Sequence, residues 1–173
     1  MELDEFKSKL IPISPRLLRF ASRLLANQED AKDMVQDVYF KLWQMRNKLE
    51  TYRSIEALAM TMTRNICIDQ LRKRKTYFQS VDSIADNRDG SEDTEKILTG
   101  KEEYNSILEM LNDLPEQQRA IIHLKDIEGY STEDVMEILD ITANTLRVNL
   151  SRARSKLRER IVQKNTIKWT ANR

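Results

Sequence analysis

Along most of this 173-residue chain the apolar residues recur every three or four positions, and they seldom alternate as they would in a strand. Three glycines and three prolines leave few positions for tight hairpins. The composition, with 40% hydrophobic and 33% charged residues, is typical of a soluble globular protein. We therefore expect an all-α fold, with enough chain for one good core or two small ones.

Charge divides the chain into two helix-rich blocks and a polar stretch between them. Residues 80–95 contain six acidic residues against one basic residue, together with a glycine, which is typical of a flexible linker. We expect an N-terminal helical domain over residues 1–78, an acidic linker over 79–98, and a C-terminal helical domain with a polar tail over 99–173.

Residues 141–160, ITANTLRVNLSRARSKLRER, combine a core-facing stripe with a basic outer side. At about 100° per residue one narrow sector should pack inward; its members are Leu146, Leu150, Ala153, Leu157 and Ile161. The outward side suits the major groove of DNA, because arginine, asparagine and methyl-bearing side chains can read base edges. The candidate readers are Thr145, Arg147, Val148, Asn149, Ser151 and Arg152, and Arg154, Arg158 and Arg160 are better placed for phosphates.

The residues before this segment predict a helix-turn-helix. Pro115 indicates a helix start and Gly129 its end. Ser131 then begins a short helix with a capping-box-like start, whose Val135, Ile138 and Leu139 face inward. Residues 140–142 form a tight turn into the basic helix, as in DNA-binding helix-turn-helix proteins. A surface helix with solvated arginines is the alternative.

In the N-terminal block, residues 28–45 predict a helix with two contact sides. Its core side carries Ala31, Val35, Val38, Leu42 and Met45. Its far side carries Asp33, Gln36, Asp37, Phe40 and Trp43. Two large aromatic residues away from the core indicate a second contact, either with another helix of the domain or with a partner protein.

The next predicted helix, SIEALAMTMTRNICIDQLRKRK, begins with Ser54 as its N-cap and is apolar on two sides. One side contains Ile55, Leu58, Ala59, Met62 and Ile66, and the other contains Met60, Cys67 and Leu71. Between them lies a polar strip of Thr61, Asn65 and Arg72, interrupted by Ile68, which leads into a basic helix end. The strip suits an extended polyanion; a solvated face with a basic end is the alternative.

Catalysis finds little support in the sequence. The lone His123 has no cysteine or second histidine near it and is better interpreted as structural. Cys67 is the single cysteine, so it excludes an internal disulfide and a cysteine-built zinc site, and it is expected to be a small apolar core residue. No glycine-rich phosphate loop is present. We expect no enzyme activity, no catalytic residue, no cofactor and no metal.

Location also follows from composition. No run of about 18 apolar residues and no charged-then-apolar leader is present, so neither membrane insertion nor a secretory signal is expected. A single cysteine fits a reducing compartment. We expect a cytoplasmic protein, whose net charge of +1 confines any DNA contact to locally basic segments.

Three segments of the chain resemble bacterial RNA polymerase sigma factors of the extracytoplasmic-function (ECF) class of the sigma-70 family. In order they are RFASRLLANQEDAKDMVQDVYFKLW, TRNICIDQLRKR and LPEQQRAIIHLKDIEGYSTEDVMEILDITANTLRVNLSRARSKLR, and the resemblance as a whole covers about residues 17–161. The resemblance implies a promoter-specificity subunit that binds core RNA polymerase, recognises the minus-thirty-five and minus-ten elements and nucleates promoter melting.

The resemblance also assigns a partner to each exposed face. Asp33, Gln36 and Asp37 would contact the clamp helices of the polymerase beta-prime subunit, which favours the partner surface on that helix. The residues that would hold the unpaired minus-ten strand are Tyr52, Arg53, Thr61, Asn65 and Arg72, the first two in a loop over 49–53. The basic helix would read the minus-thirty-five element, and the beta flap and an anti-sigma factor are further expected partners.

The sequence departs from the family pattern at the helix-turn-helix. Asp140 occupies a turn position where many relatives carry glycine, and aspartate tolerates a left-handed backbone better than most residues. Val148 and Asn149 replace a common serine and arginine, which changes the expected promoter sequence but not the mode of binding. Two other functions remain as alternatives: a free-standing helix-turn-helix regulator and a helical adaptor with no DNA role.

Overall fold

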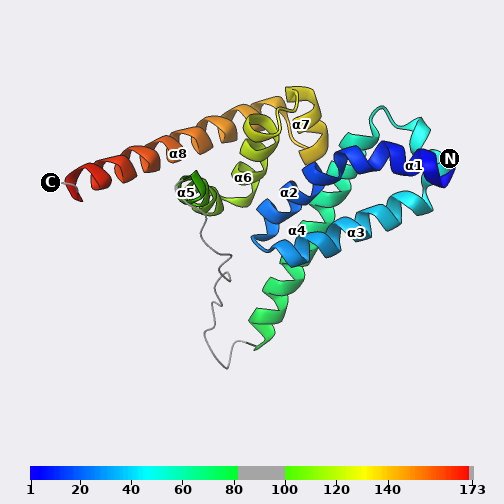
Figure 1. Cartoon of the computed structure of the whole chain (residues 1–173), viewed down its shortest axis with the longest axis horizontal. Coiled ribbons are helices and arrows are strands. Elements are labelled where there is room, and N and C mark those ends of the chain that lie inside the picture. Colours follow the sequence, from blue (N-terminus) through cyan, green and yellow to red (C-terminus); the bar gives the residue numbers. More distant parts are fainter. Residues whose placement is uncertain (82–99, 172–173) are drawn as a thin grey trace. The chain divides into compact units, whose positions relative to one another are not determined.

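The computed structural model describes residues 1–81 and 100–171, which form two separate helical units (Figure 1). Every regular element in these two stretches is a helix, which confirms the all-α prediction. The expected linker lies outside the described residues except at 79–81, which continue the last helix of the N-terminal unit. No described helix is both long and apolar enough to cross a membrane.

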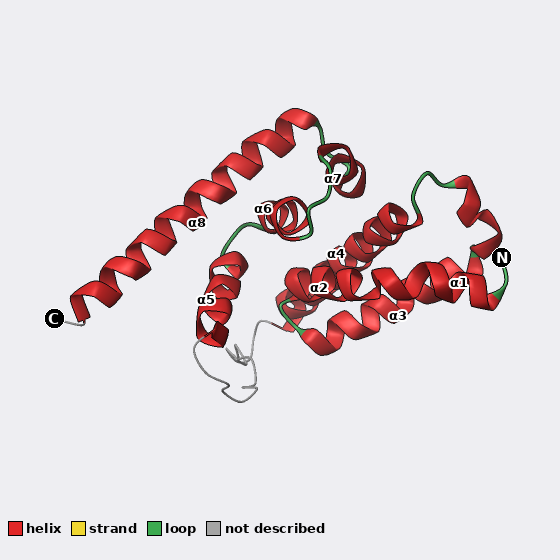
Figure 2. Ribbon diagram, turned by 45° about the horizontal axis from the view of Figure 1, so that its top comes forward, coloured by secondary structure: helices red, strands yellow, loops and turns green. Residues whose placement is uncertain are grey.

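The N-terminal unit is built on three helices that pack against one another, α2 (Ser14–Leu25), α3 (Gln28–Gln44) and α4 (Ile55–Val81) (Figure 2). The core residues of α2 are Leu17, Phe20, Ala21, Leu24 and Leu25. The predicted inner side of α3 is confirmed, since Ala31, Val35, Val38 and Leu42 are buried, although Met45 is only half-buried. Asn27 caps α3 by accepting a hydrogen bond from the backbone N–H of Asp30 at 3.0 Å.

Helix α4 begins where the sequence predicts. The Ser54 hydroxyl oxygen accepts a hydrogen bond from the N–H of Ala57 at 3.1 Å, which confirms the N-cap. Of the predicted apolar positions, Ala59, Met60 and Cys67 are fully buried; Ile55, Leu58, Met62, Ile66 and Leu71 are half-buried. Burial raises the pKa of the Cys67 thiol to about 12, so this thiol is protonated and inert, as expected of a core residue.

A short helix that the sequence analysis missed, α1 (Leu3–Leu10), packs on the end of α3 through an aromatic contact. The rings of Phe6 and Trp43 meet edge to face, with centroids 5.0 Å apart. The guanidinium of Arg46 lies 4.4 Å from the Trp43 ring centroid. The Trp43 side chain therefore packs within the N-terminal unit. A 3₁₀ turn, η1 (Ile11–Ile13), joins α1 to α2.

The C-terminal unit contains α5 (Gly100–Asn112), α6 (Glu116–Ile122), η3 (His123–Ile127), α7 (Thr132–Leu139) and α8 (Ala143–Ala171). One cluster joins α5, α6 and α8 through buried Leu111, Leu114, Ile122 and Ala153, with Leu108, Leu150 and Leu157 packed against it. The predicted inner stripe of α8 is correct up to Leu157 but wrong at Ile161, which is 45% exposed. The earlier turns of α8 pack on the apolar cluster with α5 and α6, but α8 extends beyond this cluster, so Ile161 lies outside it.

The segment η3 is a π-helical turn that the periodicity did not predict. The N–H of Glu128 donates to the carbonyl of His123 at 2.9 Å, five residues back, and Gly129 ends the segment at a φ of +74°. His123 is 2% exposed, and its Nε2 lies 3.4 Å from Oε1 of Glu128, whose side chain is also enclosed. This is the environment of a structural histidine.

Candidate nucleic-acid interface

The predicted short helix, turn and long basic helix are all present in the C-terminal unit. Ser131 caps α7: its hydroxyl accepts from the N–H of Asp134 at 3.0 Å and donates to the Asp134 carboxylate at 2.7 Å. Asp140 has a φ of +51°, the left-handed conformation expected of this residue in the turn. Thr142 then caps α8 by accepting from the N–H of Thr145 at 3.2 Å.

The first turns of α8 expose a basic face with one apolar residue on it. Arg147, Ser151 and Arg152 are exposed, and Val148 is 36% exposed, as predicted for the outward side. Two other predicted base readers are partly engaged within the unit. The Thr145 hydroxyl lies 2.9 Å from that of Thr142, and the Asn149 amide donates to Gln117 Oε1 at 3.3 Å and to the Thr145 carbonyl at 3.0 Å.

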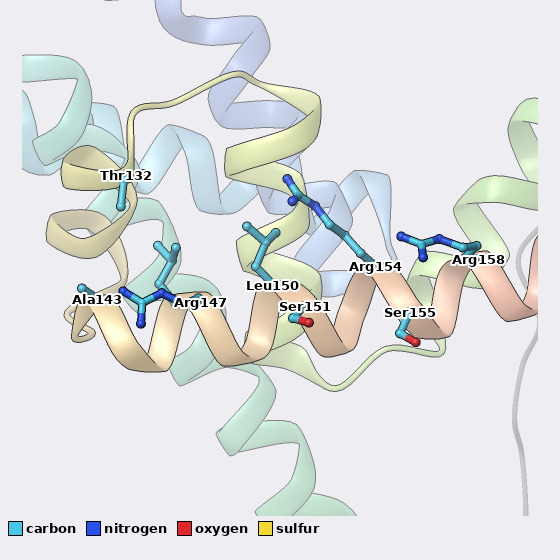
Figure 3. A pocket seen from close by; sticks show the side chains of 9 residues that line it. Thr132, Ala143, Arg147, Leu150, Ser151, Arg154, Ser155 and Arg158 are labelled. Atoms are coloured by element: carbon cyan, nitrogen blue, oxygen red, sulfur yellow. The ribbon is translucent and has the colours of Figure 1, made fainter.

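A groove of about 550 Å³ follows one flank of α8 (Figure 3). Leu146 and Leu150 give it an apolar part, and its polar lining contains three arginines, Arg147, Arg154 and Arg158. The hydroxyls of Ser151 and Ser155 lie along the same stripe. Cationic donors and hydroxyls in line along one helix are suited to a row of phosphates or another extended anion.

Four arginines of α8 that the sequence analysis assigned to DNA differ in their surroundings. They are Arg152, Arg154, Arg158 and Arg160. Arg154 donates from Nε and Nη2 to the two carboxylate oxygens of Asp126, at 2.9 and 2.6 Å, and this pairing raises the pKa of Arg154. Arg160 is half-buried and pairs with Asp113. Arg152 and Arg158 are exposed and have no ion pair within the described residues. No pattern in the sequence pointed to Asp126, because it lies 28 residues before Arg154 in the chain.

In the N-terminal unit, the predicted strip on α4 is polar, but not all of its side chains are exposed to solvent. Asn65 is exposed and accepts a hydrogen bond from Arg64 at 3.3 Å. Arg72 is exposed, with Nη1 3.9 Å from an Asp69 carboxylate oxygen. Thr61 is half-buried, and its hydroxyl donates to the Ala57 carbonyl at 2.9 Å. The strip therefore offers one exposed amide, whose oxygen accepts a hydrogen bond from Arg64, and one exposed guanidinium.

A loop was predicted over residues 49–53, and this prediction is wrong for residues 49–51. Residues Arg46–Thr51 form a 3₁₀ helix, η2, and Leu49 is 1% exposed, because it anchors this segment in the core. Tyr52 and Arg53 follow η2 and are exposed, so the segment presents an aromatic ring just before α4, next to a guanidinium that already has an ion-pair partner.

Four residues of α3 form an exposed patch that we call the acidic face: Asp33, Gln36, Asp37 and Phe40. Their spacing places them one above another on the helix surface. The Phe40 ring is 63% exposed beside the two carboxylates. Neither Asp33 nor Asp37 has an ion pair within the described residues. Unlike Trp43, Phe40 has no ring contact within the described residues that would explain its position.

Known proteins match both units in the order of the chain. The family model of Sigma-70 region 2 matches residues 13–77, and that of Sigma-70 region 4 matches residues 104–157. ECF RNA polymerase sigma factor EcfG of Rhodopseudomonas palustris is 26% identical over 154 residues, which cover 89% of this chain and 83% of that protein. The chain belongs to the ECF class of the sigma-70 family. It is thus a promoter-specific transcription initiation factor, in a family of non-enzymatic polymerase subunits.

Further relatives agree with this assignment. ECF RNA polymerase sigma factor SigW of Bacillus subtilis is 23% identical over 167 residues, with 91% of this chain and 89% of SigW covered. Among solved structures, sigma factor RpoE from Bartonella quintana, crystallised in complex with the anti-sigma factor NepR, is 29% identical. It matches with a TM-score of 0.77 over 91% of this chain and 96% of that one. In this ECF sigma factor, α8 extends beyond the region 4 match to Ala171.

Proposed function

We propose that this sigma factor binds core RNA polymerase, recognises the minus-thirty-five and minus-ten promoter elements, and nucleates melting of the promoter. The observation that carries the proposal is the exposed basic face at the start of α8, which follows a capped α7 and a tight turn. The chain itself performs no chemistry, since the polymerase makes the RNA. The proposed site of action is the cytoplasm.

The acidic face is the proposed contact with the polymerase. Exposed carboxylates at Asp33 and Asp37, with the Gln36 amide between them, can pair with basic residues of the beta-prime clamp helices. Phe40 supplies an apolar anchor of the kind that concentrates binding energy at interfaces. The beta flap is the proposed second contact of the polymerase, as the family resemblance implies.

The strip on α4 and the segment before it are the proposed binding site for the unpaired minus-ten strand. The Asn65 amide can form hydrogen bonds with a base edge, and Arg72 can hold a phosphate. Tyr52 is exposed for stacking on a base, and Arg53 adds a cation beside it. Thr61 contributes less, because its hydroxyl already donates to the backbone. Captured bases offset the stacking energy that melting removes.

The basic face of α8 is the proposed reader of the minus-thirty-five element in the major groove. Arg147, Val148, Ser151 and Arg152 are its main candidates, since they are exposed and their side chains have no hydrogen bond or ion pair in the part of the chain that the structure describes. Thr145 and Asn149 rank below them because of their hydrogen bonds within the unit. Of the two proposed phosphate contacts, Arg158 is the stronger candidate, because Arg154 is held by its ion pair with Asp126.

An anti-sigma factor is a further proposed partner. The proposal is supported by the similarity to RpoE, which was crystallised in complex with the anti-sigma factor NepR. A protein that covers the acidic face or the basic face of α8 would keep this sigma factor from polymerase or promoter.

Reconstitution tests the proposed function. Purified full chain is added to core RNA polymerase, and RNA synthesis is mapped on a genomic fragment library of the encoding bacterium. We expect initiation at specific sites that core polymerase alone ignores, and loss of these sites with the double variant Arg147→Ala/Arg152→Ala. Tight binding of the chain alone to palindromic duplexes, with no specific initiation, would instead indicate a free-standing regulator.

A further inference from the structure

The pairing of Arg154 with Asp126 sets this arginine apart from its neighbours on the groove of α8. Arg154 uses its Nε and one Nη in two hydrogen bonds to a single carboxylate, the fork geometry in which guanidinium groups bind phosphates. Arg147 and Arg158, one or two turns away on the same flank, have no acidic partner within the described residues. Asp126 thus occupies the donors that a DNA phosphate would use.

Both partners are accessible to solvent. The Arg154 side chain is 48% exposed and that of Asp126 is 32% exposed. The pair therefore lies at the surface of the unit and is open to exchange with an external anion. It joins α8 to η3, the π-helical turn, so the position of the carboxylate is fixed by the fold.

We propose that Asp126 restrains duplex binding by this sigma factor, because its carboxylate competes with the DNA backbone for the Arg154 guanidinium. The inference rests on the proposed function, since it takes the α8 face as the DNA-binding face. A phosphate that approaches Arg154 must either displace Asp126 or bind beside its negative charge, and both routes weaken the contact.

The restraint acts on affinity for duplex DNA in general and not on the choice of sequence. Phosphate contacts provide nearly all of the non-specific binding of a DNA-binding protein, whereas base contacts distinguish sequences. An arginine held by an internal carboxylate removes one phosphate contact from every sequence equally. The exposed base readers, Arg147, Val148 and Arg152, are left unchanged. The affinities for promoter and random DNA therefore fall by the same factor, and the discrimination between them still depends on the base readers.

The test compares two variants that remove the same charge. Asp126→Asn frees Arg154 and keeps the size of the side chain. Asp113→Asn is the matched control, because Asp113 also pairs with an arginine of α8, Arg160. The sequence placed Arg160 with the phosphate contacts, but it is half-buried, does not line the groove and is not among the proposed contacts. Binding of the full chain to a fluorescent mixed-sequence duplex of about 30 base pairs is measured by anisotropy between about 50 and 200 mM salt.

For Asp126→Asn we expect roughly threefold to tenfold tighter binding and a salt slope steeper by up to about 0.9, the value of one added phosphate contact. Asp113→Asn should tighten binding less than twofold, which at about 0.4 kcal/mol is near the scatter of surface changes. The gain should disappear in the double variant Asp126→Asn/Arg154→Ala. A gain that persists there, or an equal gain for Asp113→Asn, would show that net charge alone is responsible and would overturn the proposal.

Unchanged or weaker binding by Asp126→Asn, with its thermal midpoint preserved, also overturns it. If that variant unfolds early, Asp126→Ser supplies the second neutral side chain for the same measurement. Arg152→Ala separates this inference from the proposed function. Weaker binding by Arg152→Ala together with no gain from Asp126→Asn refutes only the restraint. No effect of Arg152→Ala refutes the DNA-binding face, and the restraint with it.

Discussion

Asp37 and Asn65 are exposed side chains on different helices of the N-terminal unit, and each represents one proposed contact. Asp37 lies on the acidic face of α3, and Asn65 lies on the polar strip of α4. Neither is part of the core, so substitution at either position should leave the fold intact. The polymerase contact and the single-strand contact can therefore be tested separately.

Asp37→Arg should abolish association with core polymerase. The substitution replaces a carboxylate with a cation at the centre of the acidic face, and like charges across an interface cost several kcal/mol. Co-purification of tagged sigma factor with core polymerase measures the effect. Asp4→Arg, the same charge change on exposed α1 of the same unit, is the control and should co-purify normally. Normal recovery of polymerase by Asp37→Arg would remove α3 from the interface.

Asn65→Ala should impair promoter opening more than initial duplex recognition. The exposed amide is proposed to bond an unpaired base, which exists only after melting. We expect roughly a tenfold loss of open complex, the equivalent of about 1.4 kcal/mol, by permanganate footprinting of holoenzyme on promoter DNA. Gln44→Ala, which removes another exposed amide, is the control. Equal losses in closed and open complexes would contradict the proposed role.

Cys67 gives the N-terminal unit a dependence on alkaline pH. Burial raises the pKa of this thiol from 9.0 to about 12, so the folded state favours the protonated form. Its contribution to stability is complete below pH 9 and is lost as the pH rises toward 12. The unfolding free energy of the wild type relative to Cys67→Ala should fall by on the order of 2 kcal/mol between about pH 8 and pH 11. A constant difference over this range would refute it.

At the scale of elements, η3 connects the core of the C-terminal unit to its helix-turn-helix. This π-helical turn encloses His123 and Glu128 together, and the Lys125 ammonium donates to the carbonyl of Tyr130 at 3.1 Å. The same turn carries Asp126, which pairs with α8. A change in η3 therefore affects both the stability of the unit and the arginine stripe.

His123→Ala should destabilise the C-terminal unit by about 2–4 kcal/mol, because it opens a cavity and separates a buried pair. Urea denaturation followed by circular dichroism measures the change. Ile127→Ala, in the same turn but 49% exposed, should cost less than about 0.5 kcal/mol. Similar losses from the two variants would mean that the His123–Glu128 pair has no special role.

Local signals predicted most of the helices and their ends. The caps at Ser54 and Ser131, the helix end at Gly129 and the left-handed Asp140 all depend on residues within a few positions, so they can be recognised in the sequence. The exposed faces of α3 and α8 followed from helical periodicity in the same way.

Features that depend on distant residues could not be predicted. The partner of Trp43 is Phe6, 37 positions earlier, and that of Arg154 is Asp126, so spacing within one helix reveals neither. Exposure at Ile161 depends on where the neighbouring helices end. Ala26 has a φ of +51° although alanine has no preference for this conformation, so only the packing of α2 and α3 explains it.

At the scale of the whole molecule, two small units each carry one proposed DNA contact. Two weak binding sites on one chain gain apparent affinity when their separation is fixed, since the second contact becomes intramolecular. Core polymerase is proposed to fix that separation. Neither unit then needs tight binding of its own.

The full chain alone should bind promoter duplex poorly, and the addition of core polymerase should raise the apparent affinity by roughly 10²–10⁴-fold. Anisotropy of labelled promoter DNA, with and without polymerase, measures both values. Asp37→Arg provides the control, because its affinity for promoter duplex, whatever its value in the absence of polymerase, should not rise when core polymerase is added. Tight binding by the wild-type chain alone would contradict the proposal that high affinity requires core polymerase.

The length of α8 has a mechanical consequence for these contacts. Its 29 residues form one uninterrupted rod about 43 Å long, and bending such a rod requires stretching of backbone hydrogen bonds along one side. A protein that binds near Ala171 would therefore move the whole rod, including the first turns of α8, which are proposed to read bases. A small tilt applied there would lift Arg147 and Arg152 out of register with the bases without touching the DNA.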